Sequence, residues 1–66
     1  MTGDAEARQL RLVEHVRRAC AEAVAAGFQD AAMSGLCHEG AVEAAVGAVQ
    51  SLKAEALLAA AEAAID

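Results

Sequence analysis

The residues with the greatest chemical potential in this 66-residue chain are the neighbouring Cys37, His38 and Glu39, followed by Cys20. A thiolate, an imidazole and a carboxylate are all metal ligands, and a thiol beside an imidazole also forms cysteine nucleophiles. Consecutive residues on a helix point about 100° apart, however, so such neighbours rarely reach one metal ion. The more ordinary interpretation makes Cys37 a small apolar packing residue. It makes His38 the end of a helix, where its partial charge suits the helix dipole.

A small metal-binding or redox-sensing protein is the alternative function that these residues suggest. If the helices fold back on one another, Cys20, Cys37 and His38 could meet as a soft, zinc-type or redox site. Against this, Cys20 falls in the middle of an apolar helix face, where cysteine is a common packing residue. His15 falls on the charged face of the same helix and is a poor fourth ligand.

Motifs for catalysis are missing from the sequence. It contains no glycine-rich phosphate loop, no paired CxxC units, no HExxH and no serine-centred elbow. The acidic residues are scattered, and a chain of this length has little room for a pocket that excludes water. We therefore expect no catalytic residue, no cofactor and no enzyme activity.

The composition predicts helices with little bulk to pack between them. Alanine fills 20 of the 66 positions, proline is absent and Phe28 is the only aromatic residue. Alanine is the best helix former, but its side chain fills little of a core. Small domains in this position commonly gain stability from a disulfide, a metal or an oligomer interface. We expect a single all-α domain over 1–66, with two or three helices in an antiparallel helical hairpin or small bundle, completed by oligomerisation or by a larger protein.

Charge and hydropathy set expectations for location and partners. No charged N-terminal segment precedes an apolar run, and no uncharged stretch is long enough to span a bilayer, so we expect a cytoplasmic protein with reduced cysteines. Residues 19–66 carry Lys53 against seven acids, which disfavours nucleic acid and anionic membranes. A third hypothesis is a nucleic-acid regulator that docks through the cations of the first helix, which are Arg8, Arg11, Arg17 and Arg18.

The glycines and the helical periodicity predict the element boundaries. We expect a helix over about 4–26 that ends at Gly27, a short helix over about 29–37, a turn at 38–40 and a helix over about 41–64. Because Gly27 is the only punctuation between the first two helices, one long helix to about Gly35 is the alternative.

The segment 31–52 resembles the centre of a tetratricopeptide-type helical hairpin. A bulky residue late in one helix, a glycine at the turn and small residues at the start of the next helix carry the resemblance; these are Leu36, Gly40, Glu43, Ala44 and Ala45. The motif's aromatic positions and a second copy are absent. The resemblance therefore implies helix–turn–helix geometry and no function.

The last predicted helix supplies the surface that we assign to a partner. It has one apolar stripe, and its final turns are apolar in two directions, one of which a monomer would expose. Fraying of the chain end into solvent is the alternative. The assigned residues are Val42, Ala45, Val46, Val49, Leu52, Leu57, Leu58, Ala61 and Ile65. This pattern favours a non-catalytic interaction module, such as a small accessory, assembly or regulatory subunit that binds itself or a larger protein.

Overall fold

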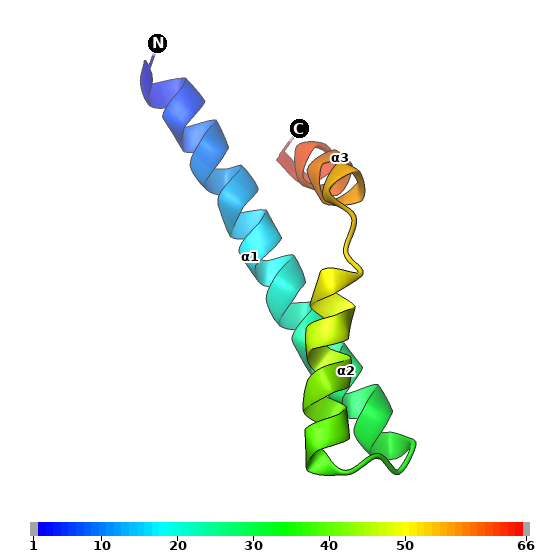
Figure 1. Cartoon of the computed structure of the whole chain (residues 1–66). Helices are drawn as coiled ribbons and strands as arrows, with labels where there is room; N and C mark the ends of the chain where they lie inside the picture. The colour runs from blue at the N-terminus through cyan, green and yellow to red at the C-terminus, as the bar shows by residue number, and fades with distance from the viewer. Residues whose placement is uncertain (1, 66) are drawn as a thin grey trace.

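The computed structural model describes residues 2–65, with side chains for residues 3–64, and consists of three helices. Helix α1 spans Thr2–Met33, α2 spans His38–Gln50 and α3 spans Ala54–Ile65. Figure 1 shows α1 as a long rod, with α2 and α3 placed one after the other along it. No strand occurs within residues 2–65, so the predicted all-α class is confirmed.

Helix α1 runs through Gly27, where the main prediction placed its end. The expected division into helices at 4–26 and 29–37 is therefore wrong, and the alternative of one long helix is right. A glycine inside a helix costs about 1 kcal/mol relative to alanine. Here Gly27 faces α2, and the missing side chain allows the two backbones to approach closely.

Helix α1 ends in a Schellman motif centred on Gly35, which has a φ of 90°. The amide of Leu36 donates to the Ala31 carbonyl at 3.0 Å, and the amide of Gly35 donates to the Ala32 carbonyl at 3.1 Å. The turn thus lies at 34–37, and the predicted turn at 38–40 is wrong. Those three residues instead form the first turn of α2.

The predicted continuous helix over 41–64 is also wrong, because the chain leaves the helical path at Ser51. Both the amide and the hydroxyl of Ser51 donate to the Gly47 carbonyl, at 2.9 and 2.8 Å. A serine hydroxyl that bonds back to this carbonyl favours a bend over regular helix. The break re-aims α3, so that the axes of α2 and α3 differ by 71°.

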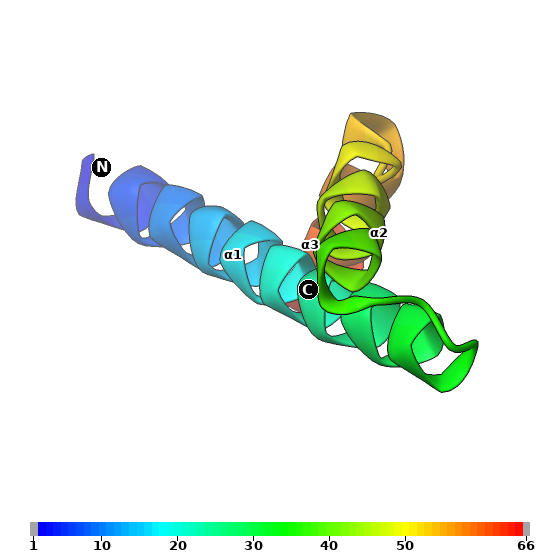
Figure 2. The same cartoon turned by 60° about the horizontal axis from the view of Figure 1, so that its bottom comes forward.

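Both shorter helices pack on α1, and neither packs on the other in the part of the chain that is described. Figure 2 shows α2 leaving the line of α1 obliquely rather than lying along it. At the crossing, a Cβ atom built on Gly27 would lie 3.0 Å from both the Ala44 carbonyl oxygen and the Ala48 Cβ. The result is an elongated molecule of 52 × 16 × 15 Å.

The interior consists of alanine alone among the described side chains. Ala31, Ala41, Ala45 and Ala61 are at most 6% exposed, and no large side chain is fully buried. Each buried alanine removes far less apolar area from water than a leucine or valine would. The contacts between helices therefore arise from close backbone approach rather than from interlocking large side chains.

No single helix within residues 2–65 is both long enough and apolar enough to cross a bilayer. Residues 38–50 and 54–64 meet the length and composition criteria only together, as a bent pair.

Replacement of Gly27 tests the helix crossing. Gly27→Gln places a straight side chain where the Ala44 carbonyl oxygen and Ala48 leave no space, so α1 and α2 must separate. We expect the free energy of unfolding to fall by about 1–3 kcal/mol, measured by urea denaturation.

The matched control is Gly47→Gln, since a side chain at Gly47 meets nothing within 4 Å. This change should leave stability equal or raise it by up to about 1 kcal/mol, because it replaces a helical glycine. Equal effects at the two positions would contradict the proposed role of the crossing.

Candidate interaction surface

Large apolar side chains lie on the outside of the α1–α2 pair. Five of them are between 43% and 65% exposed, and we name this set the apolar flank: Leu10, Val13 and Val24 of α1, with Val42 and Val46 of α2. Scattered exposed apolar residues are normal on soluble proteins. The apolar flank differs because its members recur along two helices that are in contact.

Helical geometry places the flank residues of α1 and α2 on the same side of the pair. At about 100° per residue, Leu10, Val13 and Val24 fall within about 60° of one another around α1, and Val42 and Val46 are about 40° apart around α2. Relative to Gly27, Val24 and Leu10 are turned by about 60° and 100° in the direction of increasing residue number, and Val42 and Val46 are turned by the same angles relative to Ala45. Val13 shares the helical direction of Ala31. Figure 1 shows α2 running back from the end of α1, and in an antiparallel pair of helices these turns point to the same side.

The structure separates the predicted interface residues into accessible and inaccessible ones. Val42, Val46 and Leu58 are exposed, whereas Val49, Leu52 and Leu57 are half-buried. Ala45 and Ala61 are buried inside the chain, so their assignment to a partner surface is wrong. The reason is that both alanines lie where a shorter helix packs on α1. The side chain of Ile65 lies outside the described residues.

The sequence predicts no protein contact on α1, although three of the five apolar flank residues belong to it. At about 100° per residue, Val13 and Val24 lie on the same apolar face of α1 as Cys20, and they are 65% and 44% exposed. The helical direction that they share with Leu10 is the signal in the sequence for a common surface. That direction identifies exposed residues only when the stretch of α1 that α2 covers is known.

The three residues of the metal hypothesis are not brought together. Cys37 lies in the turn after α1, whereas Cys20 lies thirteen residues before the end of that helix, about 20 Å along its axis. No group of three His, Cys, Asp or Glu side chains within the described range could hold a metal ion. The site predicted from Cys20, Cys37 and His38 is therefore not formed in this fold.

His38 is the first residue of α2, so its expected place at a helix C-terminus is wrong. Its ring meets Phe28 edge to face, with centroids 5.8 Å apart. Aromatic pairs of this geometry contribute about 0.5–1.5 kcal/mol beyond buried area. The contact between His38 and Phe28 thus stabilises the packing of the start of α2 on α1.

Three of the four arginines of α1 lie beside carboxylates of the same chain. Arg17 donates from Nε to Glu14 at 2.9 Å, Arg18 approaches the same carboxylate at 3.4 Å, and Arg8 lies 4.0 Å from Glu62 of α3. The hydrogen bond from Arg17 holds the pKa of Glu14 below its usual value. These pairs reduce the charge that α1 offers to a phosphate.

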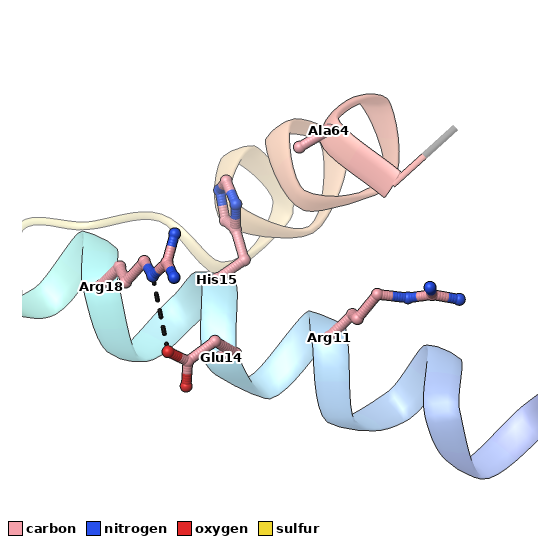
Figure 3. A pocket seen from close by; sticks show the side chains of 5 residues that line it. All are labelled: Arg11, Glu14, His15, Arg18 and Ala64. Atoms are coloured by element: carbon pink, nitrogen blue, oxygen red, sulfur yellow. Dashed lines mark ion pairs between the residues drawn. The ribbon is translucent and has the colours of Figure 1, made fainter.

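A depression between α1 and the end of α3 is lined by Arg11, Glu14, His15, Arg18 and Ala64. In Figure 3 its floor is a single face of α1, and Ala64 alone comes from another element. Figure 3 draws Glu14 paired with Arg18, which offsets one of the two arginine charges that line the depression. The depression is open to solvent and offers no buried polar group to orient a ligand.

Comparison with protein-family models, curated proteins and solved structures finds no match for this chain.

The Glu14 carboxylate gives a titration test of the pairing on α1. A native pKa below the unfolded value means that the pair stabilises the helix above the unfolded pKa, and that this contribution is lost as pH falls through the native pKa. We expect Arg17→Gln to raise the Glu14 pKa toward its ordinary value, measured by carboxyl carbon NMR. Arg18→Gln should raise it less, and the reverse order would contradict the dominant role of Arg17.

Proposed function

We propose that this chain is a non-catalytic helical interaction module, a small accessory, assembly or regulatory subunit whose structure is completed by another protein. The observation that carries this proposal is that small apolar side chains are buried while many large ones are exposed. The four buried residues described are alanines, whereas leucines, valines and a methionine remain exposed. A chain that leaves eight large apolar side chains at least 43% exposed gains by covering them with a partner.

The polar groups support a binding role over a chemical one. Among the described residues no polar or charged side chain is buried, so no titratable group is held in a low-dielectric site that would tune it for reaction. The partner that we propose is a protein, because the exposed surface is apolar and the nearby cations lie beside internal carboxylates.

Unfolding of the isolated chain at low concentration tests this proposal. At about 1 µM, where weak association is lost, we expect a broad urea transition with a free energy of unfolding below about 3 kcal/mol. Binding of a hydrophobic dye to the native chain should accompany it. A sharp two-state transition above about 5 kcal/mol for a verified monomer, without dye binding, would remove the need for a partner.

A further inference from the structure

Resting on the proposed function, we infer that the partner is a second copy of this chain, packed in antiparallel orientation, with the apolar flank of each copy facing the other. The surface area and the layout of the apolar flank each support this assignment.

The chain exposes more surface than a compact monomer of the same mass, and one subunit contact would cover the excess. The accessible surface is 4946 Å². A compact monomer of 6.7 kDa exposes about 3,900 Å², so the excess is about 1,000 Å². A stable interface of standard size removes about 800 Å² from each partner. One copy of equal size thus covers the excess, with no larger protein required.

The apolar flank divides into two parts at different positions along α1. Ala45 of α2 lies against Gly27, and α2 continues for only five more residues, about 7 Å. Val13 lies fourteen residues from Gly27, about 21 Å along α1, and is therefore beyond the end of α2. Leu10 and Val13 form one part; Val24, Val42 and Val46 form the other.

Reversal of a second copy brings these two parts into register. In a twofold dimer the same patch is used on both subunits, so each contact occurs twice. With the α1 helices antiparallel, Leu10 and Val13 of one copy lie over Val42 and Val46 of the other. A parallel pairing would instead place like parts together and leave the α1–α2 crossing to meet its own counterpart.

The charges beside the apolar flank are few. At about 100° per residue, Arg17 lies within about 20° of Leu10 around α1, and Glu39 lies within about 20° of Val46 around α2. Further charged residues of this part of α1 lie about 80–160° from Leu10; these are Arg8, Arg11, Arg18, Glu22 and Asp30. The surface area and the apolar layout therefore carry the assignment.

Sedimentation equilibrium of the full chain and two matched variants tests the inference. We expect wild type to sediment as a dimer of twice 6.7 kDa. Val46→Glu should raise the dissociation constant by about 100-fold, because it puts a charge at the centre of the apolar contact. Leu58→Glu is the control: both side chains are 50% exposed and the charge change is identical, but Leu58 lies on α3 outside the apolar flank, so the dimer should persist.

A label experiment reports the orientation independently of the variants. A spin label on Leu10→Cys, in a chain with Cys20→Ala and Cys37→Ser, is mixed with isotope-labelled wild type. We expect broadened NMR signals at Val42 and Val46 of the wild-type copy. Broadening confined to residues near Leu10, or no broadening, would overturn the antiparallel arrangement.

The outcomes separate this inference from the proposed function. A wild-type monomer at about 200 µM in low salt, or a dimer lost in Leu58→Glu but kept in Val46→Glu, overturns the inference. If that monomer unfolds broadly and binds dye, the interaction module survives with a different protein as partner. If it unfolds sharply with high stability, both proposals fail.

Discussion

The close approach of α1 and α2 at Gly27 is the constraint on which the remaining structure depends. With the Ala44 carbonyl oxygen and the Ala48 Cβ each 3.0 Å from where a side chain would begin, only small residues fit between these helices. The gain is tight backbone contact, and the cost is that no bulky side chain can enter the interior. The burial of alanine rather than a larger residue between α1 and α2 follows from this geometry.

Exclusion from the interior leaves the bulky side chains on the flanks of the helices. Val24 on α1 and Val42 and Val46 on α2 are exposed because they lie beside the contact, and Leu10 and Val13 are exposed because they lie beyond the end of α2. In an isolated chain this arrangement carries a hydrophobic cost, and in an assembly the same residues become the adhesive surface. The exposed apolar area is the feature on which the proposed binding role rests.

The break at Ser51 decides how α3 contributes. A continuous helix from residue 41 onward would follow the oblique course of α2 away from α1 and leave its apolar side in water. The bend of 71° brings α3 back across α1, where Ala61 becomes fully buried and Glu62 lies near Arg8. The hydroxyl of Ser51 donates to the Gly47 carbonyl and so disfavours regular helix at this point. The burial of Ala61 against α1 stabilises the bent arrangement.

Helical structure and the lack of bulk for a core follow from the amino-acid sequence alone, since alanine content and the absence of proline act locally. The sequence also indicates that apolar residues point in more than one direction. Packing between distant segments fixes four further features: Gly27 is a contact rather than a stop, the last predicted helix is two helices, Ala45 and Ala61 are interior, and Cys20 lies far from Cys37. These features cannot be predicted locally because a glycine or serine has the same local preference in either arrangement. The choice between them depends on the surface buried against a helix distant in the sequence.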